Sequence, residues 1–273
     1  MVLHRRPLLA ALATAAPLAA LAQEGPGHAT DRRAERWADL RRAIFADRPL
    51  EEAGEAIVLD APGRALDAAA VPIALSLAAD LAPRVRSIHL IVDENPSPLA
   101  AVFHAGPAGD LRALSTRIRV DAYTFLRVVA ETEDGRLWHT ARFVKAAGGC
   151  SAPASSDLRA ARERMGRMRF AMPQGAPNGE QAVPVQVAVS HPNTSGLQID
   201  QVSRLSIPAE FVRNVAVTYR GQPVLTVECD ISIAENPTFG FGLSGEPGGE
   251  LRVEAEDNRN RRFQGAWMVT AAG

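Results

Sequence analysis

Apolar and polar residues alternate along most of the chain, which is the pattern of β-strands that bury one face. Every second residue of 183–189 is valine, and residues 225–231 alternate in the same way. Asp134-Gly135 and Arg220-Gly221 each lie between two such runs, where they predict tight hairpin turns. Strands that recur at intervals of about eight to twelve residues, with turns between them, indicate β-sandwiches. We therefore expect an all-β protein.

The strand pattern forms two blocks. The first covers residues 30–147 and the second covers residues 181–273, while residues 148–180 between them are rich in glycine and proline. Such a composition favours turns and irregular backbone. We expect two β-sandwich domains in tandem, joined by an arm and linker over residues 148–180.

Two stretches depart from the strand pattern. A helix is predicted to begin with Thr30 as its N-cap and to stop before Pro49, because apolar residues recur at helical spacing. These residues are Trp37, Leu40, Ile44 and Phe45. A second, shorter helical pattern makes the linker partly helical: Leu158, Ala161, Met165 and Met168.

The first 22 residues have the features of a secretory signal peptide. Arg5 and Arg6 precede an apolar run, and Ala20-Leu21-Ala22 matches the small-residue cleavage site of such signals. The two arginines also fit a twin-arginine export signal. A membrane anchor is the alternative, but the apolar run is short and the chain turns polar at Gln23. We expect export to the periplasm and no stable membrane insertion.

Composition and charge narrow the class of protein. The 273 residues are 47% hydrophobic and 22% charged, with a formal net charge of -1. These values are ordinary for a globular protein that buries a core. Binding of nucleic acid requires a basic stripe that neutralises phosphates, and the sequence has none. We therefore expect no nucleic-acid partner.

Motifs for metal or cofactor chemistry are missing from the sequence. None of the six histidines forms a metal-ligand pair, and there is no C-x-x-C motif. The glycines at 240, 242 and 245 have no lysine among them and no helical pattern after them, so they are interpreted as strand or turn glycines. We expect neither a metal nor a cofactor in the chain itself.

The two cysteines lie in contrasting surroundings. Cys229 falls on the apolar face of a predicted strand, whereas Cys150 follows Gly148 and Gly149 in a segment without periodicity. A disulfide is the default in an oxidising compartment and stays open as an alternative, but a core thiol and a loop thiol rarely meet its distance limits. We expect Cys150 to be a free, accessible thiol on a flexible arm. Substitutions at Cys229 should lower stability, and Cys150→Ser should leave it nearly unchanged.

Three functions are compatible with such a thiol. An enzyme with a cysteine nucleophile requires rigid geometry, because a misplacement of about 1 Å can cost roughly a hundredfold in rate. A segment of Gly148, Gly149, Cys150, Ser151 and Ala152 is poorly suited to that, but it suits a thiol that visits other proteins' active sites. A binding module in which the cysteine is incidental remains the alternative.

Ordered motifs in both blocks resemble the two subunits of the bacterial Sox sulfur-oxidation carrier. The first block resembles SoxY through "ENPSPLAAVFHAGP" (94–107), "STRIRV" (115–120) and "VKAAGGC" (144–150). The second block resembles SoxZ through three further motifs: "VAVSHPNTSG" (187–196), "AENPTFGFGL" (234–243) and "LRVEAEDNRNRRF" (251–263). The chain thus resembles a single-chain SoxY–SoxZ fusion, over nearly all of its length after the signal.

The resemblance implies two Ig-like sandwiches and a carrier that has no turnover of its own. Cys150 matches the family's carrier cysteine, on which sulfur intermediates are held covalently, and Gly148 and Gly149 match the glycines before it. The implied partners are periplasmic c-type cytochromes and sulfur-oxidising or hydrolysing enzymes. Fusions of this kind are also similar to carriers associated with quinoprotein dehydrogenases. Ser151 and Ala152 replace the family's trailing glycines, and the chain continues, so the arm would enter a partner as a loop tethered at both ends.

Overall fold

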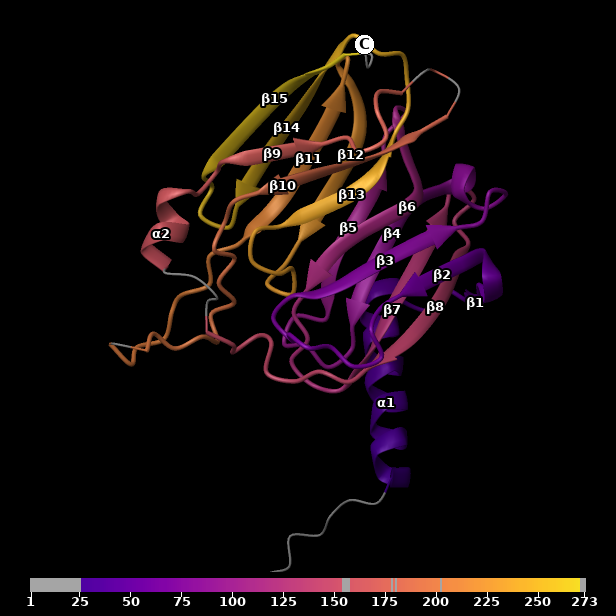
Figure 1. The fold of residues 1–273 in the computed structure, drawn as a ribbon. Coiled ribbons are helices and arrows are strands. Elements are labelled where there is room, and N and C mark those ends of the chain that lie inside the picture. Colours follow the sequence, from indigo (N-terminus) through magenta and orange to yellow (C-terminus); the bar gives the residue numbers. More distant parts are fainter. Residues whose placement is uncertain (1–25, 154–157, 178, 180, 202, 271–273) are drawn as a thin grey trace, which may run out of the picture.

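The computed structural model describes residues 26–153, 158–177, 179, 181–201 and 203–270. The predicted signal peptide lies outside these residues. Two β-sheets stack face to face, and the two helices lie outside the stack (Figure 1). The all-β fold with tandem sandwich-type sheets, a short N-terminal helix and a partly helical linker is therefore confirmed. No helix among the described residues is long and apolar enough to cross a membrane.

The larger sheet has nine strands. In spatial order they are β1 (Leu50–Glu52), β8 (Leu137–Val144), β7 (Thr124–Thr132), β4 (Val85–Val92), β5 (Leu99–Ala105), β12 (Gln222–Cys229), β11 (Val212–Tyr219), β14 (Gly249–Asp257) and β15 (Arg262–Val269). The smaller sheet has six strands: β2 (Ile57–Asp60), β3 (Val71–Leu77), β6 (Gly109–Ile118), β13 (Thr238–Leu243), β10 (Val183–Val189) and β9 (Met168–Ala171). Single 3-10 turns precede β2 and β4: Gly54–Ala56 and Ala82–Arg84.

Both sheets run without a break from the first block of strands into the second. β5 pairs antiparallel with β12 in the larger sheet, with Phe103 opposite Val227. β6 pairs antiparallel with β13 in the smaller sheet, with Ser115 opposite Gly240. The sequence left open whether the two halves pack against each other. In the structure they share backbone hydrogen bonds in both layers.

Glycine is required where the two halves meet. A Cβ atom on Gly240 would lie 2.3 Å from Ser115 Oγ, and one on Gly109 would lie 1.9 Å from the carbonyl oxygen of Val224. Such distances are far below ordinary contact, so only a residue without a side chain lets the strands approach. The interpretation of Gly240 and Gly242 as strand glycines is confirmed, since both lie in β13.

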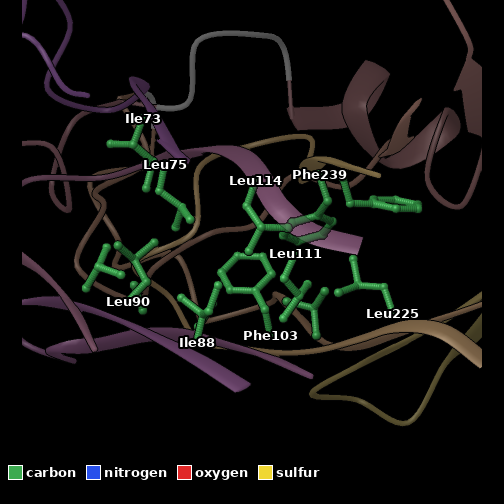
Figure 2. Packing of buried hydrophobic residues seen from close by; sticks show 14 of the residues in the cluster. Ile73, Leu75, Ile88, Leu90, Phe103, Leu111, Leu114, Leu225 and Phe239 are labelled. Carbon is green, nitrogen blue, oxygen red and sulfur yellow. The ribbon is translucent and has the colours of Figure 1, made fainter. Parts of the chain in front are cut away.

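One apolar core fills the space between the sheets across both halves (Figure 2). Phe103 of the first half meets Phe239 of the second edge to face, with ring centroids 6.0 Å apart and an interplanar angle of 75°. Leu225 on β12 belongs to the same cluster as Ile88 on β4. Full burial of one such side chain contributes about 1.5–3 kcal/mol. The core therefore couples the halves energetically as well as through hydrogen bonds.

Helix α1 (Pro26–Phe45) packs on the outer face of the larger sheet, where Leu40 and Phe45 contact Ile91 and Val129. Thr30 lies inside this helix, so the prediction that it forms the N-cap is wrong. Proline is well tolerated in a first helical turn, because the amide hydrogen that it lacks has no partner there. The helix ends where Ala46 adopts a left-handed φ of 55°.

Both predicted hairpins are confirmed. The turn at Asp134-Gly135 joins β7 to β8, and the turn at Arg220-Gly221 joins β11 to β12. The predicted linker helix is shorter than expected: α2 covers only Leu158–Glu163, and Met168 opens β9. Gly166, with a φ of 82°, turns the chain out of helical geometry, and β9 then pairs with β10.

Candidate functional site at the junction of the two halves

The chain that leaves β8 forms an ordered segment rather than a free arm. The amide of Gly148 donates to the carbonyl of Asp121 at 2.7 Å, and the amide of Gly149 donates to the carbonyl of Val120 at 2.9 Å. A Cβ atom on Gly149 would lie 2.0 Å from the carbonyl oxygen of Ala68. Gly149 is thus needed for close backbone packing, not for mobility.

Cys150 is fully buried, with 0% of its surface exposed. The expectation of an accessible thiol on a flexible arm is therefore wrong for this structure, and Cys150→Ser is no longer expected to leave stability unchanged. Exposure returns immediately afterwards, at Ser151 and Pro153. Both Cys150 and Cys229 are free, so the alternative of a disulfide between them is not realised.

A turn from the second half holds the cysteine segment in place. The Ser195 hydroxyl donates to the backbone carbonyl of Cys150, and the side-chain amide of Gln198 donates to the carbonyl of Ala152 at 2.9 Å. Ser195 and Gln198 are themselves buried and linked, since the amide of Ser195 donates to Gln198 Oε1 at 3.2 Å. Neither residue stands out from the sequence pattern, although Ser195 lies in the motif 187–196.

Buried polar groups fix the backbone on either side of that turn. Asn193 bridges two segments: its Nδ2 donates to the carbonyl of Ile233 at 3.1 Å, and its Oδ1 accepts from the amide of Val212 at 3.0 Å. The Nδ1 atom of His191 accepts from the amide of Asn193 at 3.0 Å. Burial lowers the pKa of His191, which also lies 3.4 Å from an oxygen of Asp257. His191 is thus a neutral structural residue.

The other side of the cysteine is formed by residues 119–121. Asn95 ties this segment down, because its Nδ2 donates to the carbonyl of Arg119 at 2.8 Å and its Oδ1 accepts from the amide of Asp121 at 2.9 Å. Asp121 Oδ1 lies 3.3 Å from the amide of Cys150, which donates to it. Residues from the motifs 94–107, 115–120, 144–150 and 187–196 therefore meet around one thiol.

This environment suppresses the reactivity of the thiol. Burial, with Asp121 as a further cause, raises the pKa of Cys150 to about 12, while Arg119 opposes the shift. An ordinary thiol has a pKa of about 8.5, and only the thiolate is a good nucleophile. Near neutral pH, the thiolate fraction of Cys150 is therefore far below that of an exposed cysteine. In the position that the structure shows, the thiol is thus protected from reaction.

The second cysteine lies elsewhere in the fold. Cys229 ends β12, pairs with Ala101 of β5 and is partly buried against the core. Burial raises the pKa of its thiol as well. Among the residues that the structure describes, no cluster of histidine, cysteine and carboxylate side chains could hold a metal ion.

Two family models match the chain in tandem. The model described as "Sulfur oxidation protein SoxY" matches residues 41–150, and the model described as "Sulphur oxidation protein SoxZ" matches residues 170–267. The chain is a SoxY–SoxZ fusion. Its domains belong to the carrier proteins of sulfur oxidation, which act with sulfur-oxidation enzymes rather than as catalysts. The SoxY match ends on Cys150, and Ser195 and Gln198, which hold the cysteine segment, belong to the SoxZ half.

The solved structures that are similar to this chain include a protein of the same family. The sulfur carrier protein SoxY from Chlorobium limicola f thiosulfatophilum is 27% identical, with a TM-score of 0.37, over 44% of this chain and 99% of its own. A β-glycosidase from Bacteroides vulgatus is 8% identical, with a TM-score of 0.22, over 84% of the fusion and 26% of its own chain. A glycosyl hydrolase family 2 member from Bacteroides cellulosilyticus is 11% identical, with a TM-score of 0.23, over 83% of the fusion and 29% of its own chain. No curated protein matches the fusion significantly.

Proposed function

We propose that the fusion holds sulfur-containing intermediates covalently on Cys150 and presents them, in the periplasm, to partner oxidoreductases and hydrolases of the thiosulfate-oxidation type. The observation that carries this is the position of Cys150. The SoxY match ends on it, and the SoxZ half holds it through the backbone carbonyls of residues 150 and 152. Within the described structure, the hydrogen bonds of Cys150 involve its backbone amide and carbonyl and not its sulfur atom. A cargo can therefore be attached to the sulfur without loss of a hydrogen bond.

Carriage requires an opening of the segment that the structure shows closed. Five hydrogen bonds hold residues 148–152: two from backbone amides to residues 120 and 121, one from Cys150 to Asp121, and one each from Ser195 and Gln198. Each contributes about 1 kcal/mol net. Opening at a cost of a few kcal/mol lies within the normal range of local unfolding. The docked state protects the thiol between encounters, and the open state exposes it.

Partners of specific kinds follow from this proposal. Periplasmic c-type cytochromes would supply oxidation, and a sulfur hydrolase would release the product. A quinoprotein dehydrogenase is the alternative partner. Because the chain continues beyond Ser151 and Ala152, the thiol reaches any of them at the tip of a loop held at both ends.

A second function is favoured by the complete burial of Cys150. A fusion whose cysteine never opens would act as an Ig-like accessory module that binds a quinoprotein dehydrogenase or a cytochrome. Replacement of the chromosomal copy by Cys150→Ser separates the two functions, with Cys229→Ser as the matched control. A carrier loses sulfur oxidation with Cys150→Ser alone. An accessory module keeps it with both variants.

A further inference from the structure

Arg119 is a buried cation whose chain neighbours, Val120 and Asp121, accept hydrogen bonds from the amides of Gly149 and Cys150. Only 2% of its surface is exposed, and it belongs to the largest side chains that the fold buries completely. Its backbone is fixed on both sides, because its amide donates to the carbonyl of Ser232 at 2.7 Å and its carbonyl accepts from Asn95. The position of this guanidinium is therefore imposed by the fold rather than chosen by a flexible side chain.

The hydrogen bonds of Arg119 leave part of its guanidinium group without a partner among the described residues. Nη1 donates to the carbonyl of Ile233 at 2.7 Å and reaches that of Ile231 at 3.5 Å. Nε is buried and has no hydrogen-bond partner within the described part of the chain. Buried donors are nearly always paired, so an unpaired one on a charged side chain indicates a functional role.

The charge of Arg119 is equally uncompensated. No carboxylate lies within salt-bridge distance of it among the residues that the structure describes. A buried charge without a close partner is costly, and burial accordingly lowers the pKa of Arg119. Cys150 is the first of the groups whose charge would act on it, ahead of Glu235 and Asp67. We therefore expect the negative charge that balances Arg119 to lie on a group attached to the sulfur of Cys150.

We propose that Arg119 is the anion-binding residue of this carrier: its guanidinium holds the negatively charged, oxygen-bearing end of the group attached to Cys150 while the segment is docked. This inference rests on the proposed carrier function and assigns to Arg119 the binding of the anionic end of its cargo. Guanidinium groups suit such anions, because their planar fork donates two parallel hydrogen bonds. A neutral thiol leaves the positive charge of Arg119 without a counter-charge, whereas an anionic adduct on Cys150 supplies one.

Two adducts test the proposal, one anionic and one uncharged, and the Arg119→Met variant controls for their difference in size. With tetrathionate, the Cys150 thiolate attacks an inner sulfur, a sulfur–sulfur bond forms and thiosulfate leaves, so that a thiosulfonate anion stays on the cysteine. With methyl methanethiosulfonate, methanesulfinate leaves and an uncharged methyl disulfide stays. Both reactions release the thiol proton to solvent. Both are carried out on the full chain with Cys229→Ser, and intact mass confirms complete loading.

Thermal melting at neutral pH is the measurement. We expect the thiosulfonate adduct to melt roughly 3 to 10 °C above the methyl disulfide adduct, as one or two charge-assisted hydrogen bonds require. Arg119→Met should remove this difference. Arg117→Met should keep it, because Arg117, two residues away in β6, also donates to backbone carbonyls, those of Glu235 and Asn236.

Equal melting of the two adducts in protein that retains Arg119 overturns the proposal, even if Arg119→Met fails to fold. A difference that persists in folded Arg119→Met overturns it as well. These outcomes do not depend on which adducts form in cells. A carrier that lacks this anion contact is therefore distinguishable from a protein that is no carrier.

Discussion

The hydroxyl of Ser195 donates a hydrogen bond to the backbone carbonyl of Cys150, so a residue of the SoxZ half holds the cysteine of the SoxY half. The side-chain amide of Gln198 likewise donates to the backbone carbonyl of Ala152. Ser195 and Gln198 thus form a clamp on the cysteine segment, and fusion of the two domains places Cys150 and this clamp in one chain. Exposure of the thiol becomes a property of the junction rather than of a flexible tail.

Loss of the clamp should make Cys150 more reactive. Ser195→Ala leaves the buried carbonyl of Cys150 without its donor, and one such bond contributes about 1 kcal/mol net. The open population, and with it the rate of alkylation by iodoacetamide at pH 8, should rise about fivefold. Gln198→Ala should act in the same direction.

Ser203→Ala is the matched control, because the Ser203 hydroxyl makes only local contacts, with Asp200 and the amide of Leu205, among the described residues of an exposed loop of the same half. Its alkylation rate should equal that of the unaltered protein. If Ser195→Ala reacts no faster than Ser203→Ala, the hydroxyl does not govern exposure of the thiol.

The two glycines before Cys150 should respond differently to alanine. A Cβ atom on Gly149 would meet Ala68 and Val120 at 2.0–2.7 Å, whereas one on Gly148 would have open space around it. Gly149→Ala should therefore expel the segment and speed the alkylation of Cys150 by well over tenfold. Gly148→Ala meets only the strain of its φ of +76°, about 1–2 kcal/mol. Faster alkylation of Gly148→Ala than of Gly149→Ala would contradict this assignment.

Alkaline pH should weaken the fold through Cys150. Its folded pKa of about 12 lies above the ordinary value, so the native state keeps the proton that the unfolded chain releases. The associated stability is complete below about pH 8.5–9 and is lost as pH rises toward 12. Between pH 8 and pH 10 this costs about 1.5–2 kcal/mol. Urea unfolding of the unaltered protein and of Cys150→Ala measures it, since the alanine variant should lack this increment. Equal losses in both proteins would show that Cys150 does not hold its proton.

Sequence patterns predicted much of the fold, because strand alternation and turn chemistry are local. The hairpins at Asp134-Gly135 and Arg220-Gly221 and the strand around Gly240 follow from neighbouring residues alone. Pairing of β5 with β12 does not, because it joins residues more than a hundred positions apart. Ala46 and Gly166 end their helices through backbone geometry that periodicity does not report.

The site was predicted only in part. Cys150 stood out as a thiol after two glycines, but glycine permits either mobility or close packing, and Gly149 serves the second. Ser195 and Gln198 act through a fold that brings residues 150 and 195 together, so nothing local identifies them. The orphaned donor on Arg119 had no signal in the strand pattern, where an arginine is ordinarily a solvent-exposed residue.

The fusion should unfold in a single transition. Continuous sheets and one core, with Phe103 against Phe239, make neither half complete without the other. Phe239→Ala should therefore lower the stability of the whole chain by about 3–5 kcal/mol. Calorimetry with fluorescence of Trp138 and Trp267, which lie in opposite halves, should give coincident midpoints. Two separate transitions would show that the halves fold independently.

The intact mass of the protein isolated from sulfur-oxidising cells shows whether Cys150 carries the cargo. We predict added mass on Cys150 that disappears on reduction, is missing from Cys150→Ser and persists in Cys229→Ser. An unmodified Cys150 in cells whose partner enzymes are active would contradict the account.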